Sequence, residues 1–351
     1  MHPIAVEGAA LNLTEVRAEA KRRFAGVCRV CQECNGVSCA GEFPGIGGVG
    51  SGASFMNNYR SLAVLRLKMR VVHSAAEPDT SVTLFGRLLM MPVLAAPVAG
   101  ASMNFRDVLT EDELASSLIE GARQAGTLGM TGDGPNAALY ATGMRAIAAA
   151  GGAGIAITKP RDQEAIVAAI RQAEAAGAVA VGIDLDAAGI LPMRAAGQPV
   201  GPKSVGQLKE LVNCTRLPLV LKGIMCVEDA LAAREAGAAA IVVSNHGGRV
   251  LDHTPGAAEA LPEIVRAVGP DLLILADGGV RSGADVLKML ALGARAVLVG
   301  RPLAIGAVGA GAEGVRLTLE QMRNELKVAM ILTGCGEVGD AGPGVLWSPG
   351  C

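Results

Sequence analysis

The sequence predicts an α/β fold, a TIM (β/α)8 barrel with a small N-terminal extension rich in cysteine and glycine. From about residue 60 onward, short apolar runs alternate with helical stretches rich in Ala, Glu and Arg. Eight such strand–helix units fit into about 270 residues, the usual scale of this barrel. A doubly wound open sheet is the alternative, but eight near-equal units without a break in composition favour closure of the sheet.

The expected strands are short and mainly aliphatic, and helical runs follow them. One of these runs begins with acidic residues and stops at Gly237, a residue type suited to a helix C-terminus. The eight strands are expected at residues 92–98, 127–131, 154–158, 178–184, 218–223, 239–245, 272–279 and 294–300.

The pattern divides the chain into three parts. Residues 1–58 hold a helix expected at about 12–25, four cysteines and a glycine-rich stretch. Residues 59–340 are expected to form the barrel, and residues 341–351 a C-terminal tail.

The glycine-rich stretch contains a G-x-G-x-x-G pattern at Gly45, Gly47 and Gly50. A dinucleotide-binding loop requires a strand before this pattern and a helix after it. Here the pattern follows no expected strand and opens no expected helix. We therefore interpret it as a linker or lid.

Composition excludes several classes of protein. With 51% hydrophobic and 18% charged residues the chain has enough apolar mass for a large core. A net charge of −2 argues against nucleic acid as a partner. The longest uncharged stretch, 88–105, is interrupted by Pro92, Pro97 and Gly100, so it predicts a buried strand rather than a membrane span. The first residues lack the order of a secretory signal, and a cytoplasmic location is expected.

Charged and polar residues collect where the expected strands end. Lys159, Asp184, Lys222, His246 and Asp277 each end or follow an apolar run. Because the C-terminal ends of the strands surround the active site of a TIM barrel, these residues predict its position.

Two late loops predict a phosphate site. After the seventh strand come Gly278, Gly279 and Arg281, and after the eighth come Gly300 and Arg301. Glycines let backbone N–H groups approach a phosphate, and arginines bind it through two donors. The seventh and eighth loops are also where TIM barrels commonly bind phosphate.

Three stretches of the second half, residues 217–252, 261–315 and 325–335, resemble the FMN-dependent 2-hydroxy acid oxidase/dehydrogenase family. Members of this family include glycolate oxidase and lactate oxidase. Residues 65–98 resemble the family more weakly.

The resemblance implies a catalytic set at these strand ends. It makes His246 the base, Arg249 the cation that holds the substrate carboxylate, and Asp184 a carboxylate that hydrogen-bonds the base. Lys222 corresponds to a lysine that stabilises the anionic reduced flavin. The implied FMN contacts are Pro97, Val98, Ala99, Thr131, Lys222, Ser244, Asp277, Gly279, Arg281, Gly300 and Arg301.

The first half departs from the family pattern. Relatives place a glutamine and a tyrosine after the third strand, where this chain has Thr158 and Lys159, and Gly182 replaces a threonine before Asp184. A second arginine for the substrate is also missing at its usual place. We therefore expect Lys159 or Arg194 to supply the second positive charge.

Four early cysteines have no counterpart in the ordinary family. Cys28, Cys31, Cys34 and Cys39 follow a C-x2-C-x2-C-x4-C spacing. Such thiolates can hold a [4Fe–4S] cluster or a tetrahedral zinc ion, or remain free. Beside a flavin, an iron–sulfur cluster would serve as an exit for electrons.

The expected function is FMN-dependent oxidation of a small 2-hydroxy acid to the 2-oxo acid. The sequence leaves oxygen, a quinone and a redox protein open as electron acceptors, and the resemblance implies a homo-oligomer. One alternative is an FMN-dependent isomerase similar to type 2 isopentenyl diphosphate isomerase. Another is a flavin electron-transfer subunit whose substrate site has decayed.

Overall fold

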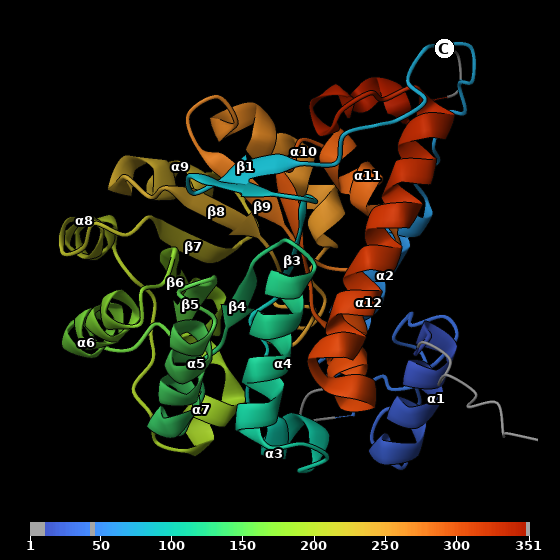
Figure 1. Ribbon diagram of the computed structural model, residues 1–351. Helices are drawn as coiled ribbons and strands as arrows, with labels where there is room; N and C mark the ends of the chain where they lie inside the picture. Colours follow the sequence, from blue (N-terminus) through green and yellow to red (C-terminus); the bar gives the residue numbers. More distant parts are fainter. Residues whose placement is uncertain (1–10, 43–45, 349–351) are drawn as a thin grey trace, which may run out of the picture.

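The computed structural model describes residues 11–42 and 46–348. Its centre is a closed barrel of eight parallel strands in the order β10-β3-β4-β5-β6-β7-β8-β9 (Figure 1). All eight expected strands are confirmed, each within its predicted range except the last residue of β7. They are β3 (Val93–Ala95), β4 (Gly129–Thr131), β5 (Gly154–Thr158), β6 (Ala180–Asp184), β7 (Leu219–Ile224), β8 (Ala240–Val243), β9 (Leu273–Ala276) and β10 (Ala296–Val299).

Helices form the outer layer of the barrel (Figure 1). The helix at 227–236 ends as expected at Gly237, which adopts a φ of 82° that favours glycine. The helices after β3 are α3 (Ala101–Phe105), α4 (Glu111–Gln124), α5 (Ala137–Ala149), α6 (Gln163–Ala175), η1 (Leu185–Gly189), α7 (Leu191–Ala195), α8 (Val205–Asn213), α9 (Val227–Ala236), α10 (Ala257–Val268), α11 (Gly283–Ala291), α12 (Arg301–Thr333), η2 (Val338–Asp340) and η3 (Pro343–Val345).

The core is aliphatic, in keeping with a chain that has only 2% aromatic residues. Alternate strand residues such as Leu94, Met130 and Val220 fill the barrel interior, while their neighbours pack under the helices. The hairpin β1 (Val82–Leu84)–β2 (Arg87–Leu89) packs against that interior cluster near the starts of the strands. It therefore closes the end of the barrel opposite to the strand ends that carry polar residues.

The N-terminal segment packs on the barrel. Helix α1 (Leu13–Phe24) begins with a capping box between Asn12 and Glu15, and it lies along α12 (Figure 1). Helix α2 (Ala53–Ala63) packs against α10 and spans the boundary expected between residues 58 and 59. At the other end, the Trp347 N–H donates to the Arg66 carbonyl over 2.8 Å. No helix in the described ranges is both long and apolar enough to cross a bilayer.

Candidate active site

A tight turn after β8 shapes the centre of the site. His246, Gly247 and Gly248 adopt successive φ values of 59°, 64° and 78°. A Cβ at Gly248 would lie only 2.3 Å from the backbone nitrogen of Phe55, so this position admits no side chain. The turn places His246 and Arg249 on the wall of one cavity, which explains why two glycines separate them.

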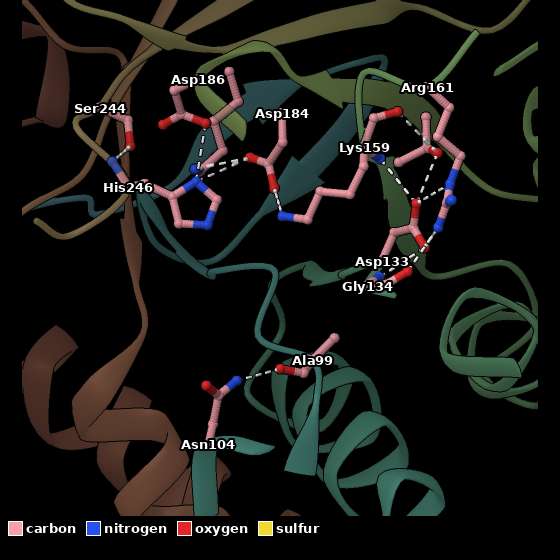
Figure 2. A network of polar contacts seen from close by, with 12 residues as sticks. Ala99, Asn104, Asp133, Gly134, Lys159, Arg161, Asp184, Asp186, Ser244 and His246 are labelled. Carbon is pink, nitrogen blue, oxygen red and sulfur yellow. Dashed lines mark hydrogen bonds and ion pairs between the residues drawn. The ribbon is translucent and has the colours of Figure 1, made fainter. Parts of the chain in front are cut away.

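His246 is oriented by a carboxylate that the sequence analysis did not single out. Its Nδ1 lies 2.9 Å from Asp186 Oδ1 and 3.8 Å from Asp184 Oδ1 (Figure 2). The expected hydrogen bond from Asp184 to the base is therefore wrong, because Asp186 takes that position. The sequence "DLD" offers two carboxylates, Asp184 and Asp186, two positions apart. Which of them faces the imidazole ring depends on the turn of η1, which begins at Leu185.

Asp184 instead pairs with two lysines. Its Oδ2 lies 2.7 Å from Lys159 Nζ, and its Oδ1 lies 2.9 Å from Lys222 Nζ. Burial would raise the pKa of Asp184, but the charges of Lys159, Lys222 and His246 hold it well below its usual range. The Lys159 ammonium is thus engaged within the protein, and Lys159 does not line the cavity as a substrate cation would. Asp184, Asp186 and His246 place three ligand-type atoms within 4.8 Å, yet the two ammonium groups already neutralise Asp184.

The imidazole of His246 is held neutral. Burial lowers its pKa below the ordinary 6.5, and the charge of Lys222 lowers it further, while Asp186 and Asp184 act in the opposite sense. A neutral imidazole at neutral pH is able to accept a proton. Because Asp186 occupies Nδ1, Nε2 is the ring nitrogen left for a bound molecule.

Arg249 presents a free donor to the cavity. Its Nη2 donates to Asn104 Oδ1 of α3 over 2.6 Å, whereas its buried Nε has no partner among the described residues. Burial lowers the pKa of Arg249 to about 10, a value at which it still carries its charge at neutral pH. Arg194 lies exposed on α7 and does not line this cavity, so the expectation that it supplies a second cation is wrong.

Two further arginines line the same cavity, and Arg301 Nη2 donates to the carbonyl of Gly247, in the turn that carries His246, over 3.1 Å. Arg281 and Arg301 both lie over the Phe55 ring, with guanidinium carbons 5.8 and 3.9 Å from its centroid. Burial lowers the pKa of Arg301 to about 9, and the neighbouring charge of Arg281 contributes. Neither arginine forms an ion pair within residues 11–42 and 46–348. Two adjacent half-buried cations without a carboxylate partner suit a bound phosphate.

Asp277 also lines this cavity. Its buried Oδ1 has no hydrogen-bond partner in the described part of the chain. Burial raises the pKa of Asp277 to about 6, although Lys222 and Ser244 act in the opposite sense. An acceptor of this kind suits the hydroxyl groups of a ribityl chain. The orphaned atoms of Asp277 and Arg249, with the paired arginines, therefore fit FMN with a substrate beside it.

The remaining predicted flavin contacts divide into two groups. Pro97, Val98, Lys222, Gly279 and Gly300 line the cavity, whereas Ala99, Thr131 and Ser244 do not. The Ala99 carbonyl accepts a hydrogen bond from Asn104, and the Ser244 hydroxyl accepts one from the His246 N–H (Figure 2). Both residues thus shape the site without facing the cavity.

Thr131 points away from the predicted flavin site. A Cβ at Gly143 of α5 would lie 2.7 Å from the Thr131 Cβ, so the threonine side chain faces that helix. The cause is strand alternation, because Met130 already faces the barrel interior. The Thr131 hydroxyl is buried and has no hydrogen-bond partner among the described residues, and a flavin contact by Thr131 stays a prediction.

The glycine-rich stretch forms part of the wall around the turn. The Val49 N–H donates to the Gly248 carbonyl, and the Ala53 N–H donates to Asp252 over 3.1 Å. Residues 46–53 are thus fixed to the loop that carries His246, as a lid would be and unlike a free linker. Gly45 of the G-x-G-x-x-G pattern lies outside the described residues.

All four early cysteines line the same cavity as His246 and Arg281. No three of their sulfur atoms lie within 4.8 Å of one another, as judged over the described residues. A tetrahedral zinc site needs sulfur atoms about 3.8 Å apart, since each Zn–S bond is about 2.3 Å. In this arrangement no three of the described thiols form a closed zinc site.

The sequence did not predict the ion pair between Asp133 and Arg161, which lies near the end of β5. Asp133 accepts from Arg161 Nη2 over 3.0 Å and from the Lys159 N–H over 3.0 Å (Figure 2). The pair fixes the backbone from which Lys159 reaches Asp184. Its two residues lie 28 positions apart, and no local pattern in the sequence connects them.

Comparison with known proteins places this geometry in a family. The FMN-dependent dehydrogenase model matches residues 46–198 and 192–348. The 4-hydroxymandelate oxidase of Amycolatopsis orientalis is 35% identical over 332 residues, which cover 84% of this chain and 90% of that protein. A peroxisomal (S)-2-hydroxy-acid oxidase of Oryza sativa subsp. japonica is 52% identical over 130 residues, 37% of this chain and 36% of that protein.

Solved structures agree with the sequence relatives. A mandelate oxidase variant crystallised with 2-hydroxy-phenylacetamide superposes with a TM-score of 0.77 at 33% identity, covering 95% of this chain and 97% of that one. Another mandelate oxidase variant, with a C4a-OH-FMN adduct, gives a TM-score of 0.75 at 32% identity, covering 95% and 98%. The chain therefore belongs to the FMN-dependent dehydrogenase family and is an FMN-dependent oxidoreductase.

Proposed function

We propose that this chain oxidises a small 2-hydroxy acid to the corresponding 2-oxo acid. One observation carries the proposal: the neutral imidazole of His246 and the unpartnered Nε of Arg249 line one cavity with the paired cations Arg281 and Arg301. A base and a carboxylate-binding cation thus line one site that also fits a phosphorylated flavin. The named activities of the relatives support this reading.

Each side chain has a distinct task in the proposed reaction. FMN, when bound, supplies the acceptor for the two electrons of the substrate. Arg249 holds the substrate carboxylate, and Asn104 fixes its guanidinium by the 2.6 Å hydrogen bond. His246 accepts a proton at Nε2, and Asp186 stabilises the imidazolium that results. Whether that proton comes from the hydroxyl or from the α-carbon, the same residues serve.

Lys222 contributes a fixed positive charge to the cavity wall. Burial would lower its pKa, but Asp184, Asp186 and Asp277 hold it well above its usual value. Its ammonium group is therefore charged at neutral pH. Such a charge favours the anionic form that a reduced flavin adopts.

The lining of the cavity indicates the kind of substrate. Phe24 and Phe105 form an edge-to-face pair with centroids 5.9 Å apart, and both line the cavity. Phe105 follows Asn104, the residue that accepts from Arg249. Arg249 also lines this cavity, and its buried Nε has no hydrogen-bond partner among the described residues. This arrangement favours a monocarboxylate with an apolar substituent over a dicarboxylate.

The other candidate functions receive less support. An isomerase of the isopentenyl diphosphate type has no need of a base paired with a carboxylate-binding arginine. A decayed substrate site would not keep the 2.9 Å contact of His246 with Asp186 and a buried, oriented Arg249. Oxidation of a hydroxy acid uses all of these groups.

Anaerobic flavin reduction tests the proposal. The FMN-loaded protein is mixed without oxygen with glycolate, lactate, mandelate and a dicarboxylic 2-hydroxy acid, and flavin absorbance and 2-oxo acid are measured. We expect the apolar monocarboxylates to bleach the flavin fastest, with one 2-oxo acid formed for each flavin reduced. Failure of every 2-hydroxy acid to bleach the flavin would overturn the proposal.

A further inference from the structure

The loop of residues 28–39 carries chemistry that the proposed reaction does not use. Its four thiols are half-buried and unpaired, and all four line the cavity that contains His246 and Arg281. Cys31 and Cys34 also line a second cavity, on whose wall lie Tyr59 and Glu325. The loop therefore separates the flavin-side cavity from a second, neighbouring one.

The spacing of the thiols selects among their uses. The four thiols belong to a single loop and line one cavity, so they face a common space. Yet within the described ranges no three sulfur atoms come within 4.8 Å of one another. A single metal ion needs closer sulfurs, whereas each thiolate of a [4Fe–4S] cluster binds a different iron atom and lies farther from the others.

Cations surround the loop and hold its backbone. The Cys34 carbonyl accepts from Arg281 Nε over 3.1 Å, and the Cys31 carbonyl accepts from Arg17 Nη2 over 2.8 Å. Arg301 is close enough for its charge to act on Cys39. A cluster with four thiolate ligands carries net negative charge, and neighbouring cations and a fixed loop suit it.

We propose that Cys28, Cys31, Cys34 and Cys39 bind a [4Fe–4S] cluster that carries electrons away from the flavin. The role of the cluster rests on the proposed function, which supplies the electrons. Oxidation of one 2-hydroxy acid releases two electrons and two protons. The two electrons leave the reduced flavin one at a time, and each one reduces the oxidised cluster by one electron. A small one-electron redox protein reoxidises the cluster, so two acceptor molecules are consumed per substrate and the protons pass to solvent.

The test begins with the full-length, FMN-loaded protein purified without oxygen. Iron, acid-labile sulfide and zinc are measured per chain, and spectra are recorded before and after dithionite. We expect about four iron and four sulfide per chain, with a broad visible absorption under the flavin bands and a paramagnetic signal after reduction. Zinc, or no metal together with four thiols that react with a thiol reagent, would overturn the proposal.

Serine variants locate the cluster. Cys31→Ser and Cys34→Ser are expected to lose iron and the paramagnetic signal but to keep FMN, while Cys214→Ser and Cys226→Ser keep both. If Cys31→Ser and Cys34→Ser keep full iron and signal, the assignment of these ligands is wrong. Should these variants fail to fold, the iron and sulfide content of the unaltered protein decides.

One further measurement separates this proposal from the proposed function. Addition of a 2-hydroxy acid without oxygen should reduce both the flavin and the cluster. If iron and sulfide are present but no 2-hydroxy acid bleaches the flavin, the proposed function is wrong and the proposed metal site is still supported. If a 2-hydroxy acid bleaches the flavin but the protein contains no iron, only the cluster proposal is overturned.

Discussion

His246 and Asp186 form the central pair of the site, with Nδ1 and Oδ1 2.9 Å apart. The neighbouring Asp184 lies 3.8 Å from the same nitrogen and is neutralised by Lys159 and Lys222. The two carboxylates therefore have different tasks: one orients the base, and the other fixes two lysines.

The pH dependence of flavin reduction reports on this pair. Because burial and Lys222 lower the pKa of His246 below 6.5, the reduction rate should rise with pH to a midpoint below that value and stay level near neutrality. Asp186→Asn removes a charge that raises this pKa, so the midpoint should move to lower pH while the rate falls about 100-fold. Stopped-flow reduction across pH measures both, with Asp229→Asn on the exposed face of α9 as the control. A midpoint above 6.5 in the unaltered protein would contradict the assignment.

Loss of the imidazole should slow the chemistry and spare the flavin. We expect His246→Gln to reduce flavin about 10³-fold more slowly, the usual loss for a general base, with FMN content unchanged. His253→Gln is a matched control, since the side chain of His253 is 77% exposed. Equal rates in the two variants would show that His246 is not the base.

Loss of the guanidinium should weaken substrate binding. Arg249→Ala is expected to lower affinity for a 2-oxo acid product by about 10- to 100-fold, since a hydrogen bond to a charged group contributes about 1.5–3 kcal/mol. Titration of flavin absorbance gives the dissociation constant. Arg194→Ala, on the exposed face of α7, should leave it unchanged. A larger effect at Arg194 than at Arg249 would reverse the assignment.

The arginine pair should distinguish FMN from riboflavin. Arg301→Ala is expected to weaken FMN binding about 10- to 100-fold and to leave riboflavin binding nearly unchanged, because only FMN carries the phosphate. Quenching of flavin fluorescence on binding measures both. The exposed Arg295 provides an alanine control. An equal loss for the two flavins would place the phosphate elsewhere.

Much of this arrangement follows from local sequence. The eight strands follow from apolar runs in the sequence. The motif "HGGR" places His246 and Arg249 on one turn, because the two positions between them adopt positive φ, which favours glycine. Arg281 and Arg301 follow neighbouring strands, so the barrel itself brings them together. These relationships depend on strand order and on turn chemistry, both of which the chain encodes locally.

Other contacts depend on geometry that no local pattern contains. Asp186 rather than Asp184 faces His246 because the chain turns into η1 directly after β6. Asn104 reaches Arg249 from α3, 145 positions away, and Asp252 accepts N–H groups at the start of α2 from 199 positions away. Lys159 appeared free for a substrate, but its strand neighbour Asp184 takes its charge.

The central claim is that one turn presents a base and a carboxylate-binding cation to a substrate lying on FMN. A crystal structure of the FMN-loaded protein with a bound 2-oxo acid tests it most directly. We predict the flavin phosphate between Arg281 and Arg301, the ligand carboxylate on Arg249 Nε, and the ligand oxygen on C2 within hydrogen-bond reach of His246 Nε2. A phosphate bound away from both arginines, or a ligand that touches neither Arg249 nor His246, would contradict the account.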